Sequence, residues 1–359
     1  MSKRRAENGG RHLAVRLGGF TVIGSLLLFL LSMRLPDPVS FKICQASRMN
    51  GFSLAELLVP REHIQSQELT RDEIVPLDMP EVVDAEGLAE LNFDRQSAGQ
   101  PEFLDGPDRI VGLELNGESR AYPVSLLAIH QVVNDELGGV PLLVSYCPWC
   151  DAVLVFDRRV GDDTLLFAAS GLLYSSNMLM YDRTERRGQE SLWCQLQGRA
   201  VSGPQAVAGA TLSMLPAELL NWGGWLAIHP DTEVAVVRDA EESPLAMDFD
   251  AYYLEAKLRY PAWPRLSGSS PLHAFERVVA VGNESGWTVY PLRQLEQELG
   301  SGSWLEMNGA VFSLSRPVEH IPATVQVVPA DGADVRIAYS LWFAWYAMHP
   351  ESEIFPVLE

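Results

Sequence analysis

The sequence predicts an α+β fold, built mainly from antiparallel β-sheet with short helices and preceded by one N-terminal transmembrane helix. Short apolar runs rich in β-branched residues alternate with Gly, Asn, Asp and Pro turn signals, which is typical of strands joined by hairpins. Two distant segments repeat one strand–turn–strand–helix pattern, which indicates a degenerate internal duplication. With 47% apolar residues, the chain can bury a sizeable core.

The N-terminal region has the pattern of a membrane anchor. Residues 1–16 carry five basic side chains, and residues 17–33 then run without a charge as LGGFTVIGSLLLFLLSM. This run is at the short end of a membrane span, and no small-residue cleavage site follows it. Because the basic residues precede the span, the N-terminus is expected in the cytoplasm. We therefore expect a single-pass protein of the inner (cytoplasmic) membrane, with its body in the periplasm or outside the cell.

Charge and cysteine content narrow the function of that body. The formal net charge is −20, and the basic residues before the span leave the exported part more acidic still. A basic stripe for nucleic acid is therefore excluded, whereas a protein thiol partner is compatible with the composition. Four cysteines are too few for a disulfide scaffold in a body of this length, so their use is expected to be local and chemical.

The duplication sets the expected domain organisation. Residues 108–124 resemble residues 276–292, and residues 221–233 resemble residues 341–353 in the same order. Each first segment reads as a hairpin at Asn-Gly or Gly-Asn followed by a Tyr-Pro that opens a short helix, and each second segment as a Trp-bearing helix that ends before His-Pro.

We therefore expect a first unit at 105–245 and a second at 246–359, after a juxtamembrane segment at 34–104. The first unit inserts about fifty more residues between its two shared segments, and that insertion carries three of the four cysteines. The second unit has no cysteine. His229 and His349 recur in both copies and are interpreted as scaffold, so the chemistry is expected in the first unit alone.

The motif that carries chemistry is Cys147-Pro148-Trp149-Cys150. It follows the apolar run 141–146 and precedes the β-rich run 151–159, so we expect a turn between two strands. Two thiols at this spacing close a disulfide, exchange one, or bind a metal. A helix N-terminus that would lower a thiol pKa is not expected here, so activation needs another group.

Three interpretations of this motif remain open. In the first, Cys147 and Cys150 perform thiol–disulfide redox chemistry, and His130 or Asp151 handles the proton. In the second, the two cysteines bind a zinc or copper ion with His130 and Cys194. In the third, they form a structural disulfide in a non-catalytic envelope module, and no cofactor is bound. The sequence does not show which cysteine is the nucleophile.

Several motifs together resemble one protein family. They read RAYPVSLLAIHQVVND, SYCPWCDAVLVFDRRV, ASGLLYSSNMLMYDR and ESLWCQLQGRAVSGP. In this order they resemble, over residues 54–240, the bacterial and archaeal Domain of Unknown Function 3179, which has no established reaction. Besides His130, Cys147 and Cys150, the resemblance points to Asn134, Asp135, Ser170, Gly171, Asn177, Tyr181, Asp182, Trp193 and Gln195.

The chain departs from the family pattern at three positions near these motifs. Ile129 stands where Trp is usual, and Gln131 replaces a Glu, so an acid is missing there. Cys194 falls where many members have Ser or Gln, which weakens its case as a ligand. Some members are labelled as selenoproteins, and the resemblance therefore favours redox chemistry over metal binding.

Overall fold

The computed structural model describes residues 48–54, 56–238, 243–299, 304–315 and 323–355. The described residues from Met49 onward form one compact unit.

The predicted membrane span at residues 17–33 lies outside the described residues. Across the ranges that the structure does describe, no helix is long and apolar enough to cross a membrane. The proposed boundary between a first and a second unit, near residue 245, stays a prediction.

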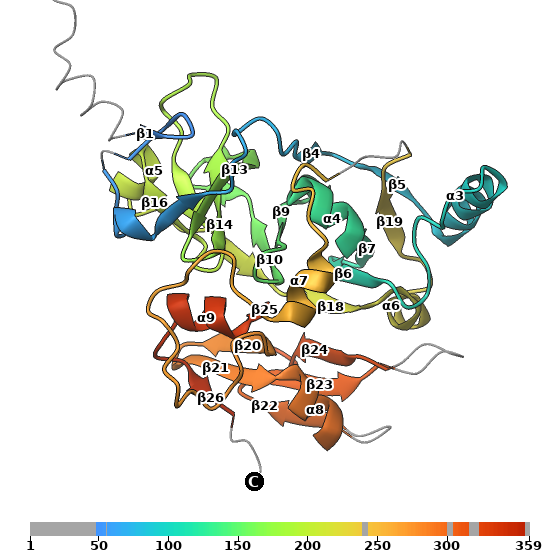
Figure 1. Ribbon diagram of the computed structural model, residues 1–359. Helices are drawn as coiled ribbons and strands as arrows, with labels where there is room; N and C mark the ends of the chain where they lie inside the picture. The colour runs from blue at the N-terminus through green and yellow to red at the C-terminus, as the bar shows by residue number, and fades with distance from the viewer. Residues whose placement is uncertain (1–47, 55, 239–242, 300–303, 316–322, 356–359) are drawn as a thin grey trace, which may run out of the picture. The chain divides into compact units, whose positions relative to one another are not determined.

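The largest sheet has nine strands (Figure 1). Its order is β26 (Glu353–Ile354), β21 (Gly286–Pro291), β20 (Arg277–Asn283), β25 (Arg336–Leu341), β10 (Ala152–Asp157), β9 (Val140–Cys147), β8 (Val132–Leu137) and β4 (Leu77–Asp78), with β17 (Ser213–Leu215) paired to β10. The single pairing of Val153 with Tyr339 joins β10 to β25. This sheet therefore links the strands of the two halves of the chain.

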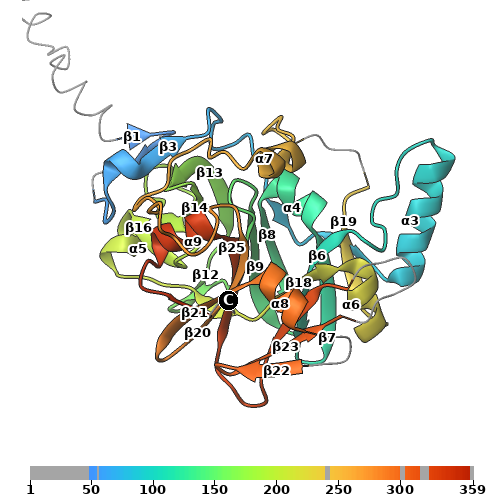
Figure 2. The same cartoon turned by 60° about the horizontal axis from the view of Figure 1, so that its bottom comes forward.

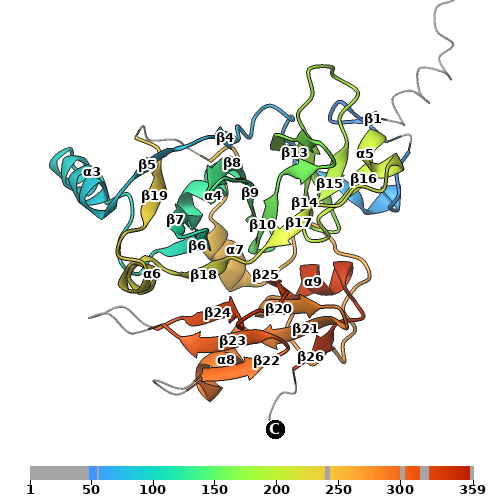
Figure 3. The same ribbon diagram turned by 180° about the vertical axis from the view of Figure 1, so that it is seen from behind.

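Two five-stranded sheets and one three-stranded sheet surround it (Figure 3). The first five-stranded sheet has the order β16 (Arg199–Ser202), β15 (Leu192–Cys194), β14 (Asn177–Asp182), β13 (Phe167–Tyr174) and β3 (Ile64–Ser66). The second has the order β18 (Glu218–Asn221), β6 (Arg109–Leu115), β7 (Glu118–Pro123), β19 (Glu233–Val236) and β5 (Glu81–Val83). The three-stranded sheet consists of β22 (Trp304–Met307), β23 (Ala310–Leu314) and β24 (Val325–Pro329).

The remaining elements are short. They are the strands β1 (Arg48–Met49), β2 (Phe52–Ser53), β11 (Arg159–Val160) and β12 (Asp163–Thr164), the 3-10 turn η1 (Arg61–His63), and the helices α3 (Ala85–Ser97), α4 (Val124–His130), α5 (Pro204–Val207), α6 (Trp222–Ile228), α7 (Phe249–Glu255), α8 (Leu292–Glu298) and α9 (Trp342–Met348). Figure 2 shows α3, the longest of the described helices, near β19, and this helix also contacts β5. Nearly all described strand pairs are antiparallel, which confirms the α+β class with mainly antiparallel sheet.

Two sets of elements follow the same plan. The first set is β6–β7–α4 followed by β18–α6–β19, and the second is β20–β21–α8 followed by β25–α9–β26. In each set the third strand along the chain pairs with the first, the first pairs with the second, and the second pairs with the fourth. Only the pairing of the second strand with the fourth is parallel. The registers match as well, because Asn221 lies opposite Arg109 and Leu341 lies opposite Arg277.

Local sequence explains the shared plan. The first hairpin turns at Asn116-Gly117, where both residues have positive φ of 53° and 85°, which these two residue types tolerate best. The second hairpin turns at Glu284-Ser285, two residues beyond the predicted Gly-Asn. In both sets a proline occupies the N-cap of the next helix, and its fixed φ suits a helix start.

The central strands are buried on both faces, and this sets where the cysteines lie. Alternate residues of β9 belong to different apolar clusters: Leu143 and Cys147 to one, Leu142 and Val144 to the other. The Cys147 side chain therefore points to the face that packs against the β13–β16 sheet.

Candidate functional site

The Cys-Pro-Trp-Cys motif forms a tight turn between β9 and β10, as the sequence predicted. Cys147 ends β9 and pairs with Ala152, the first residue of β10. The Cys150 amide donates to the Cys147 carbonyl at 3.3 Å, and Asp151 closes the turn with a φ of 47°. No helix begins within this turn, as the sequence predicted, so neither cysteine stands at the N-terminus of a helix.

Three of the cysteines are free thiols with 0% exposure: Cys147, Cys150 and Cys194. Burial raises the pKa of Cys150 well above its ordinary value, and the adjacent Cys147 raises it further. Burial also raises the pKa of Cys194 to about 12. In this arrangement Cys150 and Cys194 are therefore protonated at neutral pH.

The Asn177 side chain at the start of β14 connects two of these thiols. Its Oδ1 accepts from the Leu196 amide at 3.0 Å, which fixes which end of the side chain carries the nitrogen. Its Nδ2 then donates to Gln195 Oε1 at 2.8 Å and to Cys150 Sγ at 3.4 Å. The Cys194 thiol donates weakly to Oδ1 at 3.8 Å. One amide thus contacts both Cys150 and Cys194.

Gln195 holds this amide in place. Its Nε2 donates to the Ala152 carbonyl and to Ser145 Oγ, both at 3.1 Å, so its Oε1 faces Asn177. Ser145 in turn donates to the Leu154 carbonyl at 2.8 Å. The chain of hydrogen bonds ties the amide at Cys150 to the β9–β10 hairpin that presents the cysteines.

Residues 249–263, here called the cover segment, close the turn from outside. The Tyr252 hydroxyl donates to the Trp149 carbonyl at 3.1 Å, and the Tyr253 hydroxyl donates to the Pro148 carbonyl at 2.6 Å. The rings of Phe249, Tyr252 and Tyr260 pack on the edges and face of Trp149 with centroids 4.9–5.8 Å away.

The cover segment is also fixed to the loop before Asn177. Ser176 Oγ donates to the Tyr260 carbonyl at 2.6 Å, and Ser175 Oγ donates to the Trp263 carbonyl at 3.3 Å. None of these contacts is a strand pairing. Within the described residues, the segment is therefore held on the thiol turn by side-chain hydrogen bonds, apolar packing and cation–π contacts, without strand pairing.

Asp151 lies between two arginines that occupy matching positions in the two sets. Its Oδ1 accepts from Arg109 Nη1 at 3.0 Å and from the Tyr146 hydroxyl at 2.9 Å, and its Oδ2 accepts from Arg277 Nε at 2.7 Å. Burial alone would raise the pKa of Asp151, but the two guanidinium groups lower it below the ordinary value. This arrangement favours a permanent carboxylate and does not favour proton transfer, the role for which Asp151 was a candidate.

His130, the other candidate for proton transfer, is the last residue of α4 and is buried. Its Nδ1 lies 2.8 Å from the Val75 carbonyl, which can only accept, so the hydrogen is assigned to Nδ1 and Nε2 is the basic nitrogen. Its neighbour Gln131 accepts from the Tyr146 amide at 2.9 Å, which places the end of α4 beside the end of β9.

The proposed metal set of Cys147, Cys150, His130 and Cys194 does not appear as a ligand group. Within the described ranges, no group of three or more His, Cys, Asp or Glu side chains is placed to hold one ion. The site is instead a group of buried thiols, of which Cys150 and Cys194 contact the side-chain amide of Asn177.

The other family-motif positions mainly satisfy buried polar groups near this cluster. Asn134 donates to the Phe167 carbonyl at 2.9 Å and accepts from its amide at 2.8 Å, which ties β8 to β13. Asp135 accepts from Arg120 at 2.8 Å and from the Tyr122 hydroxyl at 2.7 Å. These residues support the scaffold and do not contact the thiols.

The same holds along β13 to β15. Ser170 donates to a carbonyl of the neighbouring strand at 2.6 Å, and Gly171 has a φ of 72° in the irregular part of β13, where a Cβ would clash. Tyr181 lies 4.5 Å from a guanidinium group, and buried Asp182 accepts from Trp193 Nε1 at 3.2 Å.

Sequence reasoning missed the tyrosines of the cover segment and the two arginines at Asp151. Tyr252 and Tyr253 lie in the connection between the repeated segments, where no motif marks them. Arg109 and Arg277 could have been recognised as matching positions, because each follows an acidic residue at the start of a repeated segment.

Comparison with known proteins identifies a family without a described reaction. No curated protein matches the chain, and no solved structure does. The family model matches residues 71–306, which is more than half of the chain. The match begins later than the resemblance predicted at 54–240 and extends through the cover segment into the second set. The chain therefore belongs to the family described as Protein of unknown function (DUF3179).

Proposed function

We propose that Cys147 and Cys150 form a dithiol–disulfide couple that exchanges with a disulfide of a partner protein. The observation that carries the proposal is a pair of free thiols in one tight turn, with an amide hydrogen of Asn177 directed at the Cys150 sulfur. A hydrogen bond donated to sulfur favours the thiolate, which is the form that attacks a disulfide.

The reaction balances with a disulfide as the oxidant. One cysteine of the pair, as its thiolate, attacks the partner disulfide, whose S–S bond breaks and releases one thiol after that sulfur takes up a proton. The second cysteine then attacks the mixed disulfide and releases the second partner thiol. The pair loses two electrons and two protons, and the partner gains them.

Access to the pair requires movement of the cover segment. Both sulfurs are fully buried, and the burial that raises the pKa of Cys150 also disfavours attack in the closed arrangement. Since the cover is held without strand pairing, it is expected to open locally at a smaller free-energy cost than the sheets beneath it. The exchange rate should therefore follow the opening of residues 249–263.

Trapping of the mixed disulfide tests the proposal. The full chain, in a Cys44→Ser background, is incubated with oxidised glutathione and its intact mass is followed. We expect the parent to lose two hydrogens with no lasting adduct. One of the two single variants, Cys147→Ser or Cys150→Ser, should instead accumulate one glutathione.

Cys194→Ser is the matched control, because this thiol is equally buried but lies outside the turn. It should behave as the parent does. The proposal fails if the parent pair stays reduced, or if the two-hydrogen loss disappears in Cys194→Ser and persists when Cys147 or Cys150 is replaced.

We also propose that the two sets of elements arose by duplication, because the sets share their strand order and have matching registers.

We further propose that residues 17–33 anchor the body to the cytoplasmic membrane. The uncharged run after five basic residues supports this anchor. Such an anchor would place the thiols in a compartment in which disulfides form. Fractionation of cells that express the full chain should recover it with the membrane; recovery in the soluble fraction would contradict the anchor.

A further inference from the structure

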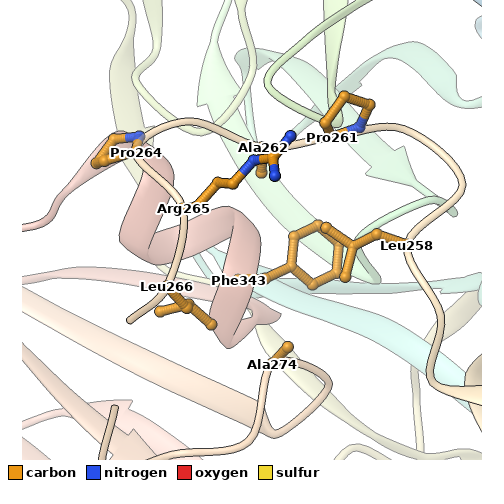
Figure 4. A pocket seen from close by; sticks show the side chains of 8 residues that line it. All are labelled: Leu258, Pro261, Ala262, Pro264, Arg265, Leu266, Ala274 and Phe343. Carbon is orange, nitrogen blue, oxygen red and sulfur yellow. The ribbon is translucent and has the colours of Figure 1, made fainter. Parts of the chain in front are cut away.

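A pocket lies beside α9, and part of its lining comes from the cover segment itself. Its volume is about 340 Å³, which is at the lower end of the range for small-molecule sites. Apolar side chains and one cation line it: Leu258, Pro261, Ala262, Pro264, Leu266, Ala274, Phe343 and Arg265. Figure 4 shows Arg265 extending along one wall toward Ala262, with Phe343 and Leu258 opposite.

Hydrogen bonds hold both walls of this pocket. The Phe343 amide donates to the Ala274 carbonyl at 2.9 Å, and Trp342 Nε1 donates to Ser270 Oγ at 3.0 Å, so the loop is fixed to the first turn of α9. On its other side the loop is fixed by the serines that precede Asn177. While the cover segment is closed, the pocket is therefore formed before a ligand arrives, which lowers the entropy cost of binding.

Among the described residues, the one charged side chain at the pocket, Arg265, has no acidic partner. Arg265 makes no ion pair with any residue in the described ranges, and its nearest ring contact is Trp263 at 6.0 Å. Arg109 and Arg277, by contrast, share the carboxylate of Asp151. In a chain of net charge −20, an unpaired guanidinium at the edge of an apolar pocket is complementary to an anion.

From this combination we infer that the pocket binds a small organic monoanion, a carboxylate with an apolar body. The apolar body fills the space between Leu258 and Phe343, and the carboxylate pairs with Arg265 at the rim. Strongly hydrated inorganic anions gain nothing from the apolar walls, and cations meet no counter-charge among the lining residues. The inference does not depend on the thiol chemistry.

A titration of the full chain with 4-phenylbutyrate, followed by ligand-observed NMR, tests the inference. 4-Phenyl-1-butanol, which has the same apolar body without the charge, is the ligand control. We expect saturable binding of the carboxylate that is about threefold to fivefold tighter than that of the alcohol, because an exposed ion pair contributes modestly. Added salt should narrow this difference.

Three variants locate the site. Arg265→Gln should bind the carboxylate about threefold to fivefold more weakly and the alcohol unchanged, whereas Arg293→Gln, which removes an exposed arginine of α8, should bind both as the parent does. Ala274→Leu fills the pocket and should abolish the saturable binding of both ligands. Because Arg265 is exposed, its variant remains informative even if Ala274→Leu fails to fold. Absence of saturation below about 10 mM, or equal carboxylate binding by parent and Arg265→Gln, would overturn the inference.

Discussion

The two matching sets of elements share a frame but differ in what each inserts into it. In both, a buried Trp of the late helix donates to a hydroxyl after the His-Pro stop: Trp225 to Thr232 at 2.9 Å and Trp345 to Ser352 at 3.0 Å. The first set inserts residues 131–217, which form β8 to β17 and carry the thiols. The second inserts residues 299–335, whose described part is the cysteine-free sheet β22–β24.

The difference shows that the frame and the chemistry are separable, although the second set still contributes to the site. Arg277, the counterpart of Arg109, completes the pair of guanidinium groups around Asp151. The Cys150 carbonyl also accepts from the Leu341 amide at 2.8 Å. Two strands of the second set, β20 through Arg277 and β25 through Leu341, therefore contact the thiol turn of the first set.

The largest expected effect comes from removing the acid that both sets share. Asp151→Asn keeps a residue type that tolerates the φ of 47° but leaves two guanidinium groups without a counter-charge. We expect the free energy of unfolding to fall by about 2 kcal/mol, less than for a fully buried ion pair because the Arg277 side chain is 48% exposed. Urea denaturation measures it, and Asp163→Asn at an exposed position of β12 is the control. A loss below about 1 kcal/mol would show that Asp151 does not join the sets.

An effect of at most similar size is expected at a position where the sets differ. Glu218 on β18 matches Ala338 on β25, and burial raises the pKa of Glu218 to about 7. At pH values between the ordinary pKa of a carboxyl group and about 7, the Glu218 carboxyl is therefore protonated in the folded chain and ionised in the unfolded chain. This contribution to stability is complete at low pH and disappears as the pH rises through about 7.

Glu218→Gln should remove that pH dependence. We expect the parent to lose on the order of 2 kcal/mol more than this variant between pH 5 and pH 8, after allowance for partial exposure. Denaturation series at both pH values measure the difference, with Glu136→Gln at an exposed site as the control. Parallel pH profiles for parent and Glu218→Gln would refute the assignment.

The smallest expected effect concerns the matching tryptophan–hydroxyl hydrogen bonds, and it tests whether they stabilise the two sets equally. Thr232→Val and Ser352→Ala each leave a tryptophan Nε1–H without its hydroxyl acceptor. We expect each to lower the free energy of unfolding by about 1–2 kcal/mol, the usual cost of an unsatisfied donor. Thermal unfolding of the two variants side by side gives the comparison. A large loss in one and none in the other would mean that the matching contacts are not equivalent.

The sequence predicted the parts of this site that depend on neighbouring residues. The turn at Cys147 between two strands was predictable because apolar runs flank it on both sides, and the segments 108–124 and 276–292 follow one plan because their turns and prolines coincide. Contacts between distant segments were not predictable. The resemblance named Asn177 and Gln195, but their orientation toward Cys150 depends on how β14 and β15 pack on the β9–β10 hairpin.

The same reason explains what was missed or assigned to another role. Tyr252 and Tyr253 reach the thiol turn from a connecting segment more than a hundred positions away, without a sequence pattern that predicts the contact. Asp151 follows Cys150 directly and was therefore a natural candidate for proton transfer, yet its side chain turns to Arg109 and Arg277. The position of Asp151 next to Cys150 in the sequence did not predict the direction of its side chain, which depends on the positive φ of Asp151.

The most direct test of the central claim is a redox titration of the full chain in glutathione buffers, with and without a chelator. Differential alkylation and mass spectrometry report the state of Cys147 and Cys150. A working couple should titrate reversibly between about −270 and −120 mV, unchanged by the chelator. A pair that stays oxidised below about −300 mV would be a structural disulfide, and thiols that react only after chelation would be metal ligands; either result would contradict the proposed exchange.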